Sequence, residues 1–226
     1  MIVVAGGRGV RAASHDGVLK QYRPIGGVPM LARAIRPFAA HPRVAVVVAV
    51  LPPGDAASPP AWLAEAGGPD LVVAAGGETR QESVASGLAV LPPDATIVLV
   101  HDAARPFVDR ELVDRVIAVA ELGAVAVPAL PLAETVKETD AAGLVVRTVA
   151  RERLVAVQTP QGFPRATLET AHQRFRGEAP ATDDAALCER LGAPVRVVAG
   201  SAMNLKITRP EDFRLAEALA AIDGSA

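Results

Sequence analysis

The chain opens with Met-Ile-Val-Val-Ala-Gly-Gly-Arg-Gly-Val-Arg-Ala-Ala-Ser-His-Asp-Gly-Val-Leu-Lys-Gln-Tyr, residues 1–22, and this stretch decides the fold. Its first four residues are apolar and predict a buried strand. A glycine-rich loop follows, and glycines let a backbone approach a ligand closely because they carry no Cβ. Successive N–H groups in such a loop can converge on one anion. Three cations, Arg8, Arg11 and Lys20, accompany the loop, so the stretch indicates a polyphosphate site.

The glycine loop alone leaves a second interpretation open, since such a loop is often only a tight connection after a strand. It lacks the Gly-x4-Gly-Lys-Ser/Thr pattern of P-loops. It also lacks the third glycine of the dinucleotide fingerprint, where Ala12 stands, although alanine is tolerated there. Lys20 comes too late in the chain for either motif, which favours a different kind of phosphate site.

The composition limits what the chain can do. Its 226 residues are enough for one large domain or two small ones, and half of them are apolar, so a sizeable core is expected. The net charge of −2 argues against a nucleic-acid-binding surface and against a polybasic membrane anchor. The single cysteine, Cys188, has no internal disulfide partner, so we expect a cytoplasmic protein. We expect neither a membrane span, which needs roughly 18 apolar residues, nor a signal peptide.

Short β-branched runs alternate with amphipathic stretches along the chain. Near-continuous apolar strands that alternate with helices predict an α/β fold with a doubly wound, mostly parallel sheet covered on both faces. We expect one domain over residues 1–226. The later strands are expected at residues 44–50, 71–74, 96–100, 124–127 and 194–198, and the helices at 30–39, 61–66, 82–91, 110–121, 165–175, 184–191 and near the end of the chain.

Sheets of this kind bind ligands beyond the carboxyl ends of their strands, so the loops that follow strands are the candidate sites. After one of these strands, Thr79 and Glu82 form a capping box that starts a helix. Gly76, Gly77 and Ser83 beside this box either complete a simple turn or leave room and polar atoms for a base or a ribose.

The sequence His-Asp-Ala-Ala-Arg-Pro, residues 101–106, follows the strand at 96–100. Asp102 can hold a hard cation such as Mg²⁺, which prefers oxygen ligands and accompanies phosphate-bearing substrates. Arg105 can donate two hydrogen bonds to phosphate oxygens. The alternative is an Asp–Arg pair that only closes a loop. We expect His101 to be a packed or supporting residue rather than a catalyst.

Two alternating segments enclose an Asp/Gly-containing turn and predict a β-hairpin arm over residues 131–150. A hairpin that projects from a sheet is marginally stable alone, so a partner subunit is expected to cover it. Nearer the end of the chain, Lys206 lies on an expected strand and is either a solvent-exposed residue or a second phosphate contact. Thr208 and Glu211 are expected to form a second capping box at the start of the last helix.

These segments together are more specific than any one of them. The chain closely resembles the 2-C-methyl-D-erythritol 4-phosphate cytidylyltransferases, the CTP-using enzymes of the non-mevalonate pathway of isoprenoid biosynthesis. The pairing of His-Asp-Ala-Ala-Arg-Pro with Thr-Pro-Gln carries the resemblance, which covers essentially the whole chain. The matching segments are the glycine loop with Arg11, Lys20-Gln21, residues 76–83, 101–106, the hairpin with Thr135, Arg151, and residues 159–161, 182–184 and 204–206.

The resemblance implies a Rossmann-like fold of the nucleotide-diphospho-sugar transferase type, Mg²⁺ as cofactor, and a homodimer formed through the hairpin arm. It also implies transfer of CMP from CTP to 2-C-methyl-D-erythritol 4-phosphate, which releases pyrophosphate. The implied catalytic residues are Arg11, Lys20 and Lys206. The implied nucleotide-binding residues are Ala5, Gly6, Gly7, Gly9, Gly77, Glu78 and Ser83. The implied substrate-binding residues are Asp102, Arg105, Thr135 and Arg151. Asp102 is also implied to lie near the metal, and Thr135 and Arg151 are implied to reach the substrate of the neighbouring subunit.

The chemistry of such a transfer suits these residue types. A phosphate monoester has a second pKa near 6, so the acceptor is mostly dianionic at neutral pH and is already a nucleophile. The reaction then requires that anions be brought together and that charge on the α-phosphate be stabilised. Positioning, cations and Mg²⁺ supply this, and no general base is needed.

Some positions depart from the family pattern and keep other functions open. Leu19 stands where proline is usual, and Ala12 where methionine is usual. These changes leave room for a relative that acts on ribitol 5-phosphate or another polyol phosphate. An NAD-dependent dehydrogenase would need an acidic residue after the second strand, where Leu51-Pro52-Pro53 stands. A non-catalytic nucleotide-binding protein would tolerate the loss of Lys20 or Asp102, but both are present.

Overall fold

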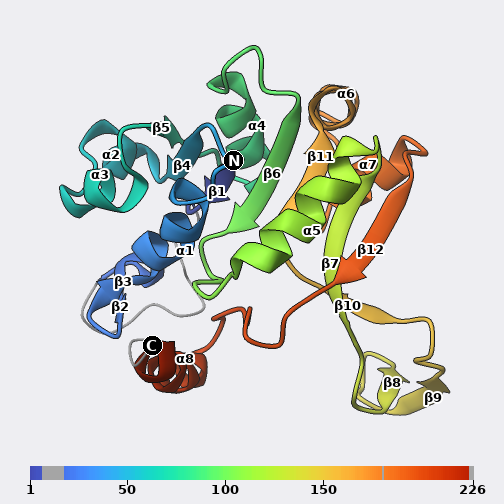
Figure 1. The fold of residues 1–226 in the computed structure, drawn as a ribbon. Helices are drawn as coiled ribbons and strands as arrows, with labels where there is room; N and C mark the ends of the chain where they lie inside the picture. Colours follow the sequence, from blue (N-terminus) through green and yellow to red (C-terminus); the bar gives the residue numbers. More distant parts are fainter. Residues whose placement is uncertain (7–17, 180, 224–226) are drawn as a thin grey trace.

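A computed structural model describes residues 1–6, 18–179 and 181–223. The strands of its central sheet are β1 (Ile2–Val4), β4 (Val47–Leu51), β5 (Leu71–Ala75), β6 (Ile97–Asp102), β7 (Val125–Pro131), β10 (Val155–Val157), β11 (Gln161–Pro164) and β12 (Val195–Ala199). They run in the order β10-β7-β11-β6-β1-β4-β5, and β12 also pairs with β7 (Figure 1).

The sheet is mostly parallel, as predicted. β1 pairs in parallel with β4 and β6, β4 with β5, and β7 with β12. β10 and β11 run antiparallel to their neighbours and were not predicted. Each spans only three or four residues, too few for apolar periodicity to distinguish a strand from a loop.

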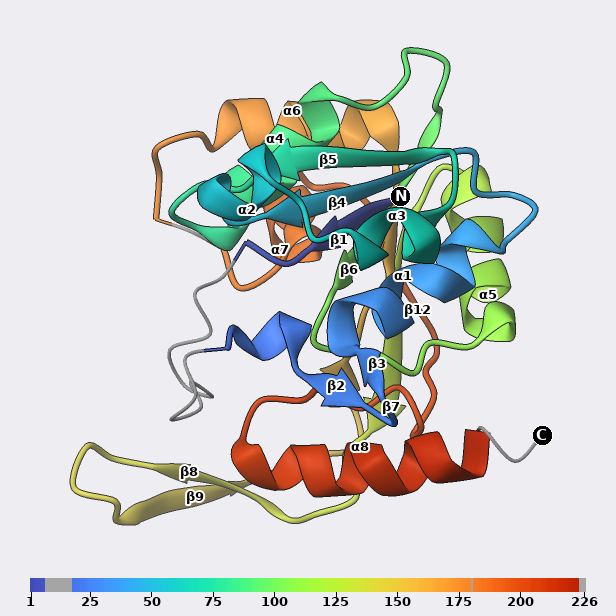
Figure 2. The same cartoon turned by 90° about the vertical axis from the view of Figure 1, so that its left-hand side faces the viewer.

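Helices cover both faces of the sheet. They are α1 (Met30–Ala39), α2 (Pro53–Ala57), α3 (Trp62–Gly67), α4 (Arg80–Ala89), α5 (Arg110–Glu121), α6 (Arg165–Arg174), α7 (Asp184–Arg190) and α8 (Pro210–Asp223), with a short 3-10 turn, η2 (Lys20–Tyr22). In Figure 2, α4 and α6 lie above the sheet, whereas α1 lies below it. Within the described part of the chain, no helix is long and apolar enough to cross a membrane.

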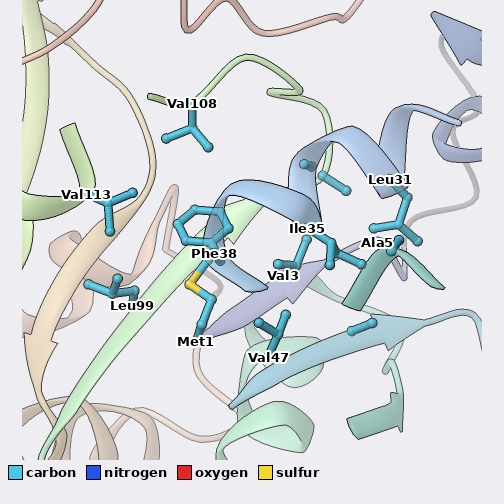
Figure 3. Packing of buried hydrophobic residues seen from close by; sticks show 14 of the residues in the cluster. Met1, Val3, Ala5, Leu31, Ile35, Phe38, Val47, Leu99, Val108 and Val113 are labelled. Carbon is cyan, nitrogen blue, oxygen red and sulfur yellow. The ribbon is translucent and has the colours of Figure 1, made fainter. Parts of the chain in front are cut away.

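The first strand shows how the two layers of core arise. Consecutive side chains of a strand point to opposite faces, and Ile2 and Val3 are both fully buried. Val3 packs in the cluster that contains Ile35 and Phe38 of α1 (Figure 3). Ile2 packs in the other cluster, which contains residues of α4, α6 and α7 such as Leu168.

The C-terminal helix, α8, packs against the segment around Lys206, where the sequence predicts a strand. Ile207 is fully buried and packs with Phe213 of α8. The expected strand is wrong, because Ile207 makes a single backbone bond to the Ala104 carbonyl at 2.8 Å rather than joining a ladder. The second capping box is wrong as well. Asp212 accepts hydrogen bonds from the Thr208 N–H, the Thr208 hydroxyl and the Arg209 N–H, whereas Glu211 is exposed.

The expected hairpin is present. β8 (Val136–Thr139) and β9 (Val145–Val149) form a separate two-stranded antiparallel sheet that projects from the rest of the molecule (Figures 1 and 2). Leu144, Val145 and Val146 at its turn and second strand are each at least 60% exposed. A second, very short hairpin, β2 (Pro24–Ile25) with β3 (Val28–Pro29), lies beside α8.

Candidate active site

A cavity of about 250 Å³ lies at the carboxyl ends of β1 and β6, beside the start of α4, which is where a doubly wound sheet binds ligands. Segments far apart in the sequence meet around it, from the first strand to the loop before α8. The predicted site residues that line it are Ala5, Gly6, Lys20, Gly77, Glu78, Ser83, Asp102 and Lys206.

Other predicted site residues do not line this cavity. Arg105 is buried, and its Nη1 donates to the Asn204 carbonyl at 2.7 Å, so it supports the loop that carries Lys206. Thr135 and Arg151 lie at the base of the hairpin, where Arg151 donates to the Ala133 carbonyl. The residues Gly7, Gly9 and Arg11 lie outside the described part of the chain.

Asp102 is a buried carboxylate that lines the cavity. Its Oδ2 accepts a hydrogen bond from Lys206 Nζ at 2.6 Å, and its Oδ1 accepts one from Arg80 Nε at 3.1 Å. Burial raises the pKa of the Asp102 carboxyl, but Arg80 and Lys206 lower it more, so the net pKa lies well below its usual range. The carboxylate is therefore ionised at neutral pH and balanced by two cations.

Lys20 lies on the wall of the same cavity, in η2. Its Nζ donates to the Ile207 carbonyl at 2.8 Å, directly after Lys206 in the chain. The neighbouring Gln21 is buried and donates from Nε2 to the Ala5 carbonyl at 3.0 Å. The segment that follows the glycine loop is thus tied both to the end of β1 and to the loop before α8.

The start of α4 forms the opposite wall. Thr79 and Glu82 make the predicted capping box, and the Ser83 hydroxyl donates to the Thr79 carbonyl at 2.9 Å. The Gly77 N–H donates to Ser83 Oγ at 3.2 Å. A Cβ on Gly76 would lie 3.2 Å from Cα of Gly6, so these two glycine backbones pack closely against each other beside the cavity.

His101 lies beneath Asp102 and does not face the cavity. Its Nε2 is 2.9 Å from the Arg105 carbonyl, and its Nδ1 is 3.0 Å from Thr159 Oγ1. Burial lowers the pKa of His101 to about 4, so the ring is neutral at neutral pH. Because a carbonyl only accepts, Nε2 carries the proton and Nδ1 accepts from the Thr159 hydroxyl. That hydroxyl accepts the Asp102 N–H at 3.1 Å, so His101 supports the site, as predicted.

Arg80 is a site residue that the sequence analysis missed. It lines the cavity, and its Nη1 also donates to Asp184 Oδ2 at 2.6 Å. Asp184 is 104 positions further along the chain, so no local pattern connects the two residues. The available signal was that residues 76–83 and 182–184 both match the family, although neither Arg80 nor Asp184 had an assigned role.

Among the residues that the structure describes, the carboxylates that line the cavity are Asp102 and Glu78. Among the described residues, no group of three or more histidine, cysteine, aspartate or glutamate side chains could hold a metal ion. A Mg²⁺ ion at this site would therefore take most of its oxygen ligands from a phosphate-bearing substrate. This is how the ion is usually bound beside phosphates, with one or two carboxylates from the protein.

The fold and the cavity define a class of protein. A doubly wound sheet with lysines, an arginine and one paired carboxylate beyond the ends of its strands is typical of a nucleotidyltransferase. The family model of the 2-C-methyl-D-erythritol 4-phosphate cytidylyltransferases matches residues 1–221. The chain belongs to this family.

Individual relatives agree with this assignment. The chain is 49% identical to the 2-C-methyl-D-erythritol 4-phosphate cytidylyltransferase of Streptomyces coelicolor, over 97% of this chain and 84% of that protein. The crystal structure of the Thermus thermophilus enzyme of the same name is 40% identical, with a TM-score of 0.80 over 97% of this chain and 98% of that one. The 4-diphosphocytidyl-2C-methyl-D-erythritol synthase of Anaerococcus prevotii, 27% identical, superimposes with a TM-score of 0.82 over 96% and 95%.

Proposed function

We propose that the chain transfers the cytidylyl group of CTP to 2-C-methyl-D-erythritol 4-phosphate, giving 4-diphosphocytidyl-2-C-methyl-D-erythritol and pyrophosphate. The observation that carries the proposal is the cavity in which Lys20, Lys206 and Asp102 meet beside the start of α4. The family assignment and the 49% identity to an enzyme of this name support it. The comparisons do not favour ribitol 5-phosphate as the acceptor.

The proposed chemistry follows from charge. The acceptor phosphate is a dianion near neutral pH and attacks the α-phosphorus of CTP, so that a P–O bond forms as the bond to pyrophosphate breaks. Lys20 and Lys206 are the lysines that line the cavity, and they would reduce repulsion between the phosphates and stabilise charge on the α-phosphate. Arg11 is proposed to act with them.

The proposed nucleotide end of the site is the part of the cavity that Ala5, Gly6, Gly77, Glu78 and Ser83 line. Gly77, Glu78 and Ser83 would contact the cytosine and ribose there. The glycine requirement at Gly77 is supported by its surroundings, because a Cβ would lie 2.4 Å from Cβ of Glu82. A side chain at this position would therefore displace the capping box.

Mg²⁺ is the proposed cofactor, and Asp102 is the residue that would hold it, together with phosphate oxygens. When bound, the ion withdraws charge from the oxygens that it contacts and so favours both attack and departure of pyrophosphate. Asp102 fits this role because its carboxylate is ionised and lines the cavity. Arg80 and Lys206 would share the carboxylate with the ion.

The hairpin arm is proposed to form a homodimer, in which Thr135 and Arg151 reach the acceptor in the neighbouring subunit. The exposed apolar side chains of the arm support this, since a folded protein in water rarely leaves such a group of residues uncovered. Arg105 would act indirectly, through the loop that carries Lys206. A cytoplasmic location is also proposed, in keeping with a buried free thiol at Cys188.

The proposal is tested by measuring pyrophosphate release from CTP and Mg²⁺, with 2-C-methyl-D-erythritol 4-phosphate and ribitol 5-phosphate assayed side by side. We expect release with the first acceptor alone. Release only with ribitol 5-phosphate would keep the fold and the mechanism but overturn the acceptor. No release with either would contradict the function and direct attention to Leu19 and Ala12.

A further inference from the structure

Arg80 joins the cavity to a buried group of charges that the proposed chemistry does not use. It is the first residue of α4, and its side chain is 29% exposed. One guanidinium nitrogen contacts Asp102 on the cavity floor, and another contacts Asp184, whose side chain is only 1% exposed. The guanidinium thus lies between a carboxylate of the site and one of the interior.

The interior carboxylate is itself fixed. Asp184 begins α7, and its Oδ1 lies 2.9 Å from Nε2 of His172 on α6. Both oxygens of Asp184 are therefore hydrogen-bonded, one to Arg80 and one to His172. A buried carboxylate is tolerated when its oxygens are satisfied in this way. Because α4, α6 and α7 meet at this point, the guanidinium is held by the packing of three helices.

The other cation on Asp102 is less constrained. The Lys206 side chain is 44% exposed and lies on a loop. In the proposed function, Lys206 also contacts the reacting phosphates, so its three donors are divided between phosphate oxygens and Asp102. Lys206 then holds Asp102 less firmly, and the orientation of the carboxylate relies more on Arg80.

We propose that Arg80 is a positioning residue, which Asp184 and His172 hold in place so that Asp102 stays fixed while Lys206 turns to the phosphates. The inference rests on the proposed function. Arginine suits this task because its planar guanidinium holds its donors in a rigid fork that can span two carboxylates, whereas the lysine ammonium is a compact charge on a flexible stem.

The test compares Arg80→Gln, Arg80→Lys and Asp184→Asn with Arg165→Gln in pyrophosphate-release assays. Arg165 is a matched control, since its side chain is 19% exposed and its Nε pairs with Glu169 at 2.7 Å, outside the site. Displacement of a reacting group by about 1 Å costs up to ~100-fold in rate. We expect Arg80→Gln to lower kcat by about 10- to 100-fold, with KM for CTP changed less than about threefold.

The conservative and remote variants separate positioning from other roles. Arg80→Lys should recover part of the lost kcat, and Asp184→Asn, which does not line the cavity, should lower kcat in the same direction as Arg80→Gln. Arg165→Gln should keep the wild-type kcat even if its unfolding temperature falls as far as that of Arg80→Gln. Thermal unfolding of each variant shows whether it is folded. If Arg80→Gln does not fold, the kcat values of Asp184→Asn and Arg80→Lys still test the inference.

Two outcomes would overturn the inference. One is a wild-type kcat in Asp184→Asn beside a low kcat in Arg80→Gln, since Arg80 would then act without its interior anchor. The other is a loss in the Arg80 variants no greater than that in Arg165→Gln. The proposed function fails separately, by absence of pyrophosphate release from the wild-type protein.

Discussion

The proposed role of Lys20 can be tested directly by substitution. Its ammonium bonds the Ile207 carbonyl at 2.8 Å, so it approaches the cavity from the side that also carries Lys206. We expect Lys20→Met, which removes the charge but keeps most of the side chain, to lower kcat by at least ~100-fold, the scale of one lost transition-state contact. Lys20→Arg should lose much less. Steady-state kinetics with both substrates saturating decide this, and a near-normal kcat in Lys20→Met would refute the role.

Cys188 permits a prediction about titration. Its thiol is fully buried, and burial, with the nearby carboxylates of Asp184 and Asp183, raises its pKa to about 12. Because the folded pKa exceeds the ordinary value of 9.0, the thiol contributes stability that is complete below pH 9 and is lost as the pH rises toward 12. A thiol reagent at pH 8 should therefore label the folded chain far more slowly than the chain in denaturant. Equal labelling rates would contradict the buried assignment.

Single residues also show where sequence reasoning ends. The capping box of Thr79 and Glu82 is confirmed because both partners lie within one helical turn. The second box is wrong because Asp212 competes with Glu211 for the same N–H groups, and a sequence pattern cannot rank two acidic residues in one turn. Arg80 was missed for a different reason, since its meaning depends on a partner from another helix.

Among the elements, α4 packs closely against β1 and β4 at Gly87. A Cβ at this position would lie 2.7 Å from Cγ2 of Ile2 and 3.1 Å from Cγ2 of Val50, and both side chains are fully buried. Alanine favours a helix over glycine by about 1 kcal/mol, but overpacking costs about 1–3 kcal/mol. We therefore expect Gly87→Ala to lower the free energy of unfolding in denaturant titrations.

Gly54 is the matched control for this prediction. It lies in α2, and a Cβ there would meet no atom within 4 Å. Gly54→Ala should therefore leave stability unchanged or raise it by up to about 1 kcal/mol. A stabilised Gly87→Ala variant would mean that β1 yields to the added methyl group, contrary to the close contact.

The sequence predicts an element correctly where its apolar residues recur with a clear period, and it misses elements that lack such a period. The helices at Met30–Ala39 and Arg110–Glu121 have the predicted bounds because each carries a long apolar stripe. The strands β10 and β11 escaped prediction because their pairing with β7 and β6 is decided by tertiary contacts rather than by a local pattern. The expected strand at Lys206 failed for the converse reason, since Ile207 is buried against α8 and not in a sheet.

At the scale of the whole molecule, the sheet order explains how the candidate site could be anticipated. β1 lies between β4 and β6, so the ends of β1 and β6 bring Ala5 and Asp102 together. An alternation of strands and helices predicts that such ends share one edge. It does not predict which distant loop reaches that edge. The family resemblance assigned Lys206 to the site, and the structure places its ammonium against Asp102.

The hairpin arm allows a test of how two subunits share their active sites, because Thr135 and Arg151 are proposed to act in the neighbouring subunit. Neither residue lines the cavity of its own chain. If the proposal holds, Lys20→Met and Arg151→Met disable different halves of one composite site. A mixed dimer then contains one site with both wild-type residues, so isolated mixed dimers should show about half of the wild-type activity.

The experiment refolds the two inactive variants together, isolates doubly tagged dimers and measures pyrophosphate release. Refolding Lys20→Met alone, or Arg151→Met alone, is the control and should restore nothing. Recovery in the mixture requires that Arg151 act across a subunit boundary, because a site built within one chain would remain broken in every dimer. Isolated mixed dimers without activity would exclude the shared site, whereas failure to isolate any dimer would contradict the proposed role of the arm itself.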